Sequence, residues 1–127
     1  MVSVIKRPLY MWMWSELSGY KNMVAIELYR AVASWNDMGC GNFSLHFAKN
    51  KEQQEVDFLI ASDNEPFLLV EAKTSDTTPS PALLKYQRSL YIPAVQVTST
   101  GDTFRLVANG TNDILVTPAA QWLSGLP

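Results

Sequence analysis

Two acidic residues and one lysine interrupt two apolar stretches of this chain. Asp57 lies within the first stretch, residues 54–60, and Glu71 and Lys73 lie at the end of the second, residues 67–73. A polar turn separates the two stretches. Apolar runs of this length, bounded by turn residues, predict the two strands of a hairpin. Carboxylates and a lysine on neighbouring strands are groups that can hold a divalent metal beside a phosphate ester. The spacing therefore suggests metal-assisted hydrolysis of a phosphodiester.

The predicted hairpin has more negative than positive charge. If its turn is centred near Asn64, Asp57 lies directly opposite Glu71, with the two Cβ atoms roughly 5 Å apart. Because Lys73 supplies one positive charge for two carboxylates, burial requires either a shared proton or a further cation. Mg²⁺ or Mn²⁺ would supply that cation, and Lys73 would then orient the attacking water. The alternative is structural: Glu71 and Lys73 form a solvated pair on one strand face, and Asp57 caps a loop.

Apolar spacing also predicts the elements that position this hairpin. A helix capped by Ser18 runs to about Asp37, with Gly39 just beyond its end. Both faces of 67–73 are apolar, which predicts a covered central strand. The other predicted elements are a strand at 43–47, a polar loop at 49–53, a turn at 62–66, a helix at 82–90, strands at 94–98 and 103–108, a brief extended run at 114–116, and a helix at 119–123 capped by Thr117 and Pro118. This order of helix, three strands, helix, two strands and helix predicts an α/β fold of the mixed α+β kind, in which helices flank a mixed sheet.

Composition limits the classes of function. With 127 residues, 47% of them hydrophobic and 17% charged, the chain is predicted to form one domain over 1–127, in which 1–14 is an apolar arm or edge strand. We expect a cytoplasmic protein without a membrane partner, because no apolar run spans a bilayer and no signal peptide is evident.

The lone Cys40 excludes an internal disulfide and is either a small buried hydrophobe or a loop thiol. A net charge of −2 restricts nucleic-acid binding to a local patch or to help from a partner. A homodimer through the aromatic arm stays open, and the chain lacks a P-loop of its own.

The string formed by Asp57 and residues 71–73 resembles the core motif of the PD-(D/E)xK nuclease superfamily. Most of the chain is more closely similar to a C-terminal domain of unknown function that follows the ATPase module in a family of bacterial and archaeal AAA+ ATPases. The segments that carry this resemblance are 9–15, 21–28, 54–59, 68–76 and 118–126. The resemblance implies a restriction-endonuclease-like fold and an AAA+ ATPase module as partner in the relatives. It also implies that Asp57, Glu71 and the carbonyl of Ala72 bind the metal, and that Lys73 positions the water.

Two departures from the family pattern put catalysis in doubt. Lys21 stands where the family typically has a glutamate that completes the metal site, and Met13 stands where aspartate is common. Helical geometry places Lys21 close to the inward stripe of the first helix, so we expect its ammonium to point toward the carboxylates and to displace the metal. Glu27 is the nearest acidic replacement, but it falls toward the edge of that stripe. The alternative function is therefore a catalytically degenerate module that binds nucleic acid or protein.

Weaker candidates lie elsewhere in the sequence. Gln87 and Tyr91 have the Gln-x-x-x-Tyr spacing of a helical motif seen in RecB-type nucleases, and one turn apart both could reach a phosphate or Lys73. Such a spacing also arises by chance on a surface helix. His46 alternates with apolar neighbours and is predicted to be a strand-face residue rather than a base. The four tryptophans, Trp12, Trp14, Trp35 and Trp122, could stack on bases, but their apolar settings favour packing.

Overall fold

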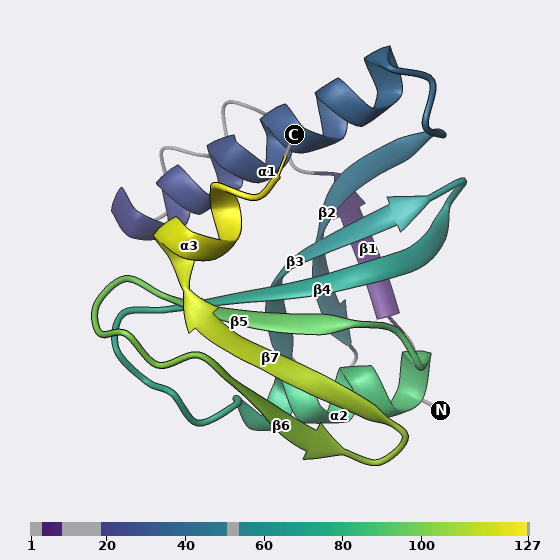
Figure 1. Ribbon diagram of the computed structural model, residues 1–127. Coiled ribbons are helices and arrows are strands. Elements are labelled where there is room, and N and C mark those ends of the chain that lie inside the picture. The colour runs from purple at the N-terminus through teal and green to yellow at the C-terminus, as the bar shows by residue number, and fades with distance from the viewer. Residues whose placement is uncertain (1–3, 9–18, 51–53, 127) are drawn as a thin grey trace.

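The computed structural model describes residues 4–8, 19–50 and 54–126. The elements are β1 (Val4–Pro8), α1 (Gly19–Asp37), β2 (Phe43–Asn50), β3 (Glu55–Ser62), β4 (Glu65–Lys73), α2 (Pro81–Leu90), β5 (Ala94–Thr98), β6 (Arg105–Asn109), β7 (Asn112–Pro118) and α3 (Ala119–Leu123). They form a mixed α+β fold in which helices flank one sheet (Figure 1). No helix in the described ranges is long and apolar enough to cross a membrane.

The sheet has seven strands in the order β1-β2-β3-β4-β5-β7-β6. Strands β1 to β4 are antiparallel to one another, whereas β4, β5 and β7 are parallel, and β6 returns antiparallel to β7. Helix α2 makes the crossover between parallel β4 and β5, as a parallel pair requires. The strand that carries Glu71 and Lys73 is thus the central one, which confirms the prediction of a covered strand.

The sheet separates two hydrophobic cores. One core lies beneath α1 and α3 and includes Val24, Leu28, Phe58, Val70, Val97 and Leu123. The other lies beneath α2 and includes Val56, Leu59, Leu69, Leu83, Tyr86 and Val116. Figure 1 shows the corresponding layers, with α1 and α3 above the sheet in this view and α2 at the bottom, behind β7. Polar residues on either face of β3 and β4 must therefore find partners within one of these layers.

Helix α1 has the predicted bounds because its apolar residues recur at helical spacing. Val24, Ala25, Leu28, Ala31 and Val32 are its buried residues. The helix ends at Asp37, and Gly39 follows with φ of 76°, a conformation that glycine adopts without steric cost. The predicted cap, Ser18, lies outside the described residues.

A two-residue turn joins β3 to β4. Asp63 and Asn64 occupy it with φ of 52° and 67°, the positive values of a type I′ hairpin turn. The turn centred near Asn64 is therefore confirmed. The pairing of β3 with β4 then proceeds through Leu59↔Leu69 to Phe58↔Val70, so the next residues along the two strands are Asp57 and Glu71.

Several predicted boundaries differ from the structure. β2 continues to Asn50, so the predicted loop at 49–53 begins too early, because this strand is extended by pairing with β1. Three strands rather than two follow α2, since the brief run at 114–116 is the middle of the seven-residue β7. Pro118 stands at the N-cap of α3 without a side-chain hydrogen bond, so the predicted cap there is wrong.

The structure bears on two alternatives that the sequence left open: an arm or an edge strand for residues 1–14, and a buried or a loop position for Cys40. β1 occupies one edge of the sheet, as an edge strand in 1–14 would, whereas residues 9–14 of that predicted arm lie outside the described part. Cys40 is exposed in the loop after α1, so it is a loop thiol rather than a buried hydrophobe.

Candidate functional site

A β-bulge sets the direction of the Asp57 side chain. The pairing of β2 with β3 shifts between His46↔Leu59 and Ala48↔Val56, so two residues of β3 oppose one residue of β2. Such an extra residue interrupts strict alternation and re-aims a side chain. Val56 and Leu59 accordingly join the core beneath α2, whereas Phe58 joins the core beneath α1. Asp57 also reaches the α1 side, where simple alternation would have placed it on the opposite face.

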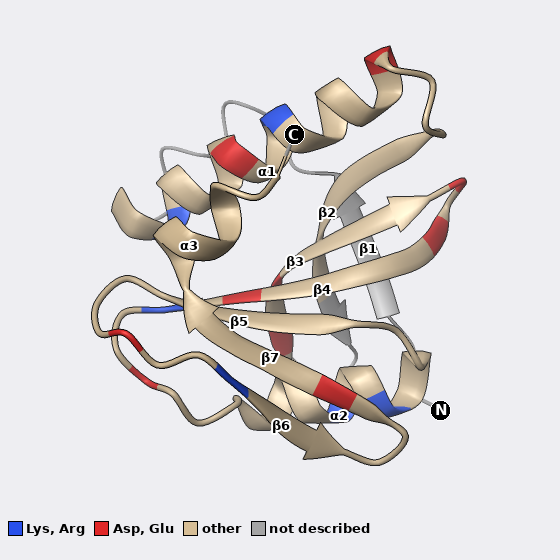
Figure 2. Cartoon of the chain, in the orientation of Figure 1, with Lys and Arg blue, Asp and Glu red and all other residues tan. Residues whose placement is uncertain are grey.

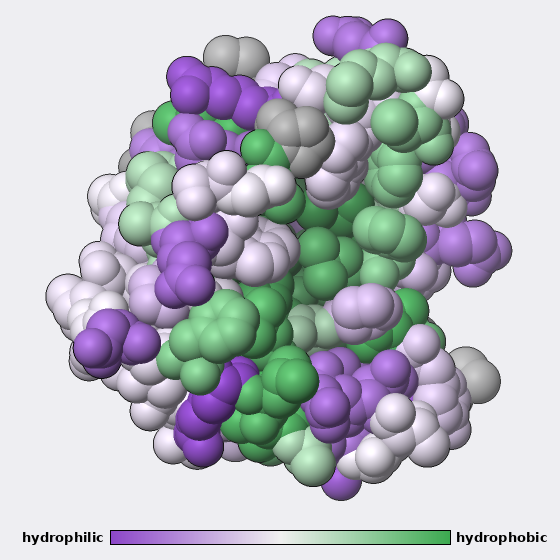
Figure 3. Space-filling model, in the orientation of Figure 1, coloured by the Kyte–Doolittle hydropathy of each residue, from purple (hydrophilic) through white to green (hydrophobic). Residues whose placement is uncertain are grey.

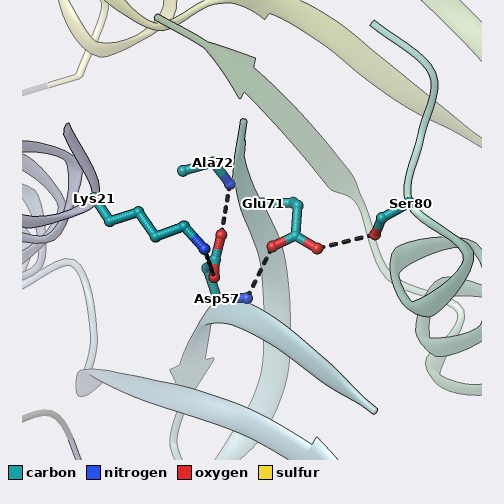
Figure 4. A network of polar contacts seen from close by, with 5 residues as sticks. All are labelled: Lys21, Asp57, Glu71, Ala72 and Ser80. Atoms are coloured by element: carbon teal, nitrogen blue, oxygen red, sulfur yellow. Dashed lines mark hydrogen bonds and ion pairs between the residues drawn. The ribbon is translucent and has the colours of Figure 1, made fainter. Parts of the chain in front are cut away.

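Both carboxylate oxygens of Asp57 accept hydrogen bonds. The Nζ atom of Lys21 lies 2.8 Å from Oδ1, and the amide N of Ala72 lies 2.9 Å from Oδ2 (Figure 4). The first contact joins α1 to β3, and the second joins β3 to β4. The prediction that Lys21 points toward the carboxylates is confirmed.

Two α1 residues, Tyr20 and Lys21, have raised pKa values, to which the charge of Asp57 contributes. Burial lowers the pKa of Lys21, but the hydrogen bond and charge of Asp57, with smaller contributions from Glu71 and Glu55, outweigh burial and raise it. Burial, followed by the charge of Asp57, raises the pKa of Tyr20 to about 12. Lys21 therefore stays cationic over the whole physiological range.

Glu71 is more deeply buried than Asp57 and has other partners. Its side chain is 4% exposed. The amide N of Asp57 donates to Oε1 at 3.2 Å, and the hydroxyl of Ser80 donates to Oε2 at 2.9 Å (Figure 4). Burial is the main cause that raises the pKa of Glu71 to about 8, and the hydrogen bond and charge of Asp57 add to it. The Ser80 hydrogen bond and the charge of Lys73 oppose this rise with smaller effects. Burial and the neighbouring Asp57 therefore favour the protonated form of Glu71.

Lys21, Asp57 and Glu71, which we call the charged cluster, reach electrical balance without a further ion. The sequence suggested either a shared proton or an extra cation as the remedy for two close carboxylates. In the structure the Lys21 ammonium is the cation beside Asp57, and the raised pKa of Glu71 favours a proton on the second carboxyl. The cluster is closed on the α1 side by an ion pair and on the α2 side by Ser80.

The sequence did not single out Ser80 or Gln96. Ser80 is the N-cap of α2, where its Oγ accepts from the Leu83 amide at 3.1 Å while donating to Glu71. The Oε1 of Gln96 accepts from the Ser80 amide, and its Nε2 donates to the carbonyls of Asp76 and Thr78. A serine directly before Pro81 is a recognisable helix cap, but only the crossover from β4 to β5 brings it to Glu71.

The predicted metal ligands lie together, but their arrangement does not fit a divalent cation. Each carboxylate oxygen of Asp57 and Glu71 already faces a hydrogen-bond donor. Metal ligands must be deprotonated, so a cation would have to displace the proton that the raised pKa of Glu71 favours. Ala72 meets the cluster through its amide N–H, not through the carbonyl that a metal would need. Within the described ranges, no three or more His, Cys, Asp or Glu side chains are placed to share a metal ion.

Lys73 lies on the same central strand, two residues beyond Glu71. It is half-buried at the end of β4, where it pairs in register with Thr98 of β5. Its charge is the smallest of the effects on the pKa of Glu71, which it lowers. In the described part of the chain, no hydrogen bond or ion pair of its side chain is found. Lys73 is therefore near the cluster but not bound into it.

The predicted helical motif of Gln87 and Tyr91 is not at this site. Gln87 is fully buried, with Nε2 donating to the carbonyls of Ile92 and Asp113 and Oε1 accepting from Asn109. Tyr91 follows the last turn of α2, is 72% exposed, and has φ of 56°. Because Ser80 marks the start of α2 at the charged cluster, Tyr91 lies roughly 16 Å farther along the helix axis. The expectation that both residues could reach Lys73 is therefore wrong, and the alternative of a surface position holds for Tyr91 but not for the buried Gln87.

The other weak candidates also have local roles. Glu27 contacts Arg30, with an O···N distance of 3.1 Å, and so does not take over the missing acidic position at Asp57. His46 lies on β2, with Nε2 2.7 Å from the Ser44 hydroxyl, as a strand-face residue would. Trp35 packs against the ring of Phe43, and Trp122 packs against the core beneath α1. Trp12 and Trp14 lie outside the described residues.

No protein-family model, no curated protein and no solved structure matches the chain. The geometry of the charged cluster therefore carries the functional argument.

Proposed function

We propose that this chain is a restriction-endonuclease-like domain in which Lys21 takes the place of the catalytic metal, and that it serves as a non-catalytic interaction module. The resemblance to the C-terminal domain of AAA+ ATPases supplies the expected partner, an ATPase module. The carrying observation is the 2.8 Å contact between Lys21 Nζ and Asp57 Oδ1.

The charges of Lys21, Asp57 and Glu71 support a non-catalytic module over a metal-dependent enzyme. A divalent ion beside Asp57 would lie close to the Lys21 ammonium and would have to displace it. It would also have to remove the proton that burial keeps on Glu71. These two costs weaken metal binding together, so the ion pair is the stable state of the site.

Charge distribution favours a protein partner over nucleic acid. The net charge is −2, and among the residues coloured in Figure 2 the blue Lys and Arg positions are spread over α1, α2, β4 and β6 rather than grouped on one element. Strong backbone binding to DNA or RNA needs several phosphate contacts from clustered basic residues. A module that docks on another protein does not need such a patch.

Calorimetric titration with Mn²⁺ tests the proposal. We expect no saturable binding to the parent chain and a gain of binding in Lys21→Glu, which restores an acidic residue at the position where the family has glutamate. Arg30→Glu is the matched control, because it makes the same charge change on the same helix away from Asp57. Tight Mn²⁺ binding by the parent that is lost in Glu71→Ala would refute the proposal.

A metal-dependent nuclease is the second candidate. It is favoured by the convergence of Asp57, Glu71 and Lys73 at one end of the β3–β4 hairpin, with Lys73 outside the ion pair. Cleavage of DNA or RNA in Mg²⁺ or Mn²⁺ would be compared between the parent and its Asp57→Ala and Glu71→Ala variants. Cleavage by the parent that both substitutions abolish would establish this candidate. Equal rates in all three would exclude it.

A further inference from the structure

The two edges of the sheet differ in how they are protected against pairing. β1 forms one edge, and its sequence contains Lys6, Arg7 and Pro8. Charged residues and proline on an edge strand are devices that prevent a further strand from adding. β6 forms the other edge; it contains one charged residue, Arg105, and no proline, and its pairing with β7 has no bulge. The β6 edge is thus regular and open.

The hairpin of β6 and β7 fixes which backbone groups of β6 face outward. Gly110 and Thr111 form its two-residue turn, so Asn109 and Asn112 are the closing, hydrogen-bonded pair. Hydrogen-bonded residues alternate along an antiparallel strand. The N–H and C=O groups of Leu106 and Ala108 therefore point away from β7, toward the open edge.

Apolar side chains lie beside these free backbone groups. Leu106 is 65% exposed and Phe104, just before the strand, is 59% exposed. Val107 and Asn109 instead face α2, where Val107 packs on the core and Asn109 bonds to Gln87. In Figure 3, hydrophobic surface is visible on the viewer's side over the region of β6 and β7. The edge thus offers both hydrogen bonds and an apolar face.

We propose that the β6 edge pairs antiparallel with β6 of a second copy of this chain, which joins the two sheets into one. A two-fold axis through Val107 places Leu106 opposite Ala108 of the second copy, so the outward groups of both strands meet in about four backbone hydrogen bonds. In this register Arg105 lies opposite Asn109, so no like charges face each other. Each exposed Leu106 thus lies opposite a small, exposed Ala108, so two β6 strands meet without steric or charge conflict, which favours a second copy of this chain over an unrelated strand.

The size of this contact predicts a weak dimer. Five residues per strand, with Phe104 and Leu106 beside them, bury less than the roughly 1,200 Å² of a typical stable interface. We therefore expect a concentration-dependent equilibrium between monomer and dimer. This inference is independent of the charged cluster and of the proposed interaction module.

Sedimentation velocity from about 10 µM to about 1 mM tests the proposal, because weak interfaces form in that range. Leu106→Lys places a charge on the open edge and should weaken dimerisation at least tenfold or so. Met38→Lys is the matched control, because Met38 is 61% exposed but lies after α1, and it should leave the equilibrium unchanged. A monomer at every concentration, or a dimer that Leu106→Lys does not weaken, would overturn the proposal.

A cross-link tests the register. In a Cys40→Ser background, Val107→Cys should form an intermolecular disulfide under mild oxidation, because a central non-hydrogen-bonded pair has Cα atoms about 4.5 Å apart. Met38→Cys, although more accessible than a cysteine at position 107, should cross-link far more slowly because it lies away from the β6 edge. Equal cross-linking of Val107→Cys and Met38→Cys would contradict pairing about Val107.

Discussion

In the described part of the chain, one polar cluster lies at each end of α2, and the two clusters satisfy their polar groups in different ways. The charged cluster at the start of α2 joins Lys21, Asp57 and Glu71. At the other end, Gln87 and Asn109 form a network of neutral amides. Glu71 and Gln87 are almost equally buried, 4% and 0% exposed. Burial alone therefore does not distinguish them.

The difference lies in how each cluster satisfies its polar groups. In the amide network, the Nε2 of Gln87 donates to two carbonyls, and the Nδ2 of Asn109 donates to both Gln87 and the Leu84 carbonyl. These bonds carry no net charge and do not depend on pH. In the charged cluster, by contrast, balance depends on a proton on Glu71 and on the ammonium of Lys21. A change of pH or a new cation can alter that balance, so this cluster can respond to its surroundings and the amide network cannot.

The largest effect should come from breaking the amide network. Gln87→Leu would remove one of the two acceptors of Asn109 and the side-chain donor to the buried carbonyls of Ile92 and Asp113, and we expect a loss of about 3 kcal/mol in the free energy of unfolding. The loss should be the same at pH 6 and pH 9, as measured by urea unfolding. Tyr91→Phe, in the same sequence motif, should change nothing. Parental stability in Gln87→Leu would show that the network is not structural.

A smaller, pH-dependent effect should come from the charged cluster. Because the pKa of Glu71 rises from its ordinary 4.5 to about 8 on folding, the folded state holds its proton more tightly. The free energy of unfolding should therefore fall as pH rises from about 4.5 to about 8, and stay level on either side of that window. Glu71→Gln removes the titrating group, so we expect it to stabilise the protein by about 2 kcal/mol at pH 9 and to have little effect at pH 4.

The matched control for this comparison is Glu65→Gln. Glu65 lies on the same strand but is exposed beside the turn. Thermal unfolding from pH 4 to pH 9 should show the same fall in the control as in the parent. A parent whose stability rises between pH 5 and pH 8 relative to Glu71→Gln would contradict the raised pKa.

The features that were predictable from the sequence are those that depend on neighbours along the chain. Helix α1 was found from its apolar spacing, and the β3–β4 hairpin from its turn residues. The orientation of Lys21 could be predicted because the apolar periodicity of α1 alone decides which of its residues face the core. The central position of β4 followed from apolar residues on both of its faces.

The features that were missed depend on pairing between distant elements. The bulge at Asp57 arises from its register with β2, and nothing in the sequence around Asp57 indicates this bulge or the turn of its side chain toward α1. Gln87 and Tyr91 have a suggestive spacing, but the direction of α2 carries them away from the cluster that Ser80 contacts. Spacing within a helix cannot show which end of that helix meets a site.

The smallest effect should come from Ser80, which connects the charged cluster to the helix whose far end holds the amide network. Ser80→Ala removes the cap of α2 and should lower the free energy of unfolding by about 1 kcal/mol at pH 5. Its hydroxyl also lowers the pKa of Glu71 by donating to Oε2. The variant should therefore retain the Glu71 proton to higher pH, which moves the upper end of the stability decline upward.

Ser80→Thr separates these two roles from a general loss of packing. Threonine keeps a hydroxyl that can cap the helix and donate to Glu71, so both the stability and the pH profile should stay close to those of the parent. In a Glu71→Gln background, Ser80→Ala should still cost the capping energy but should no longer shift any pH midpoint. A midpoint that moves in that background would mean that another group titrates, and that Glu71 is not the pH-sensitive member of the charged cluster.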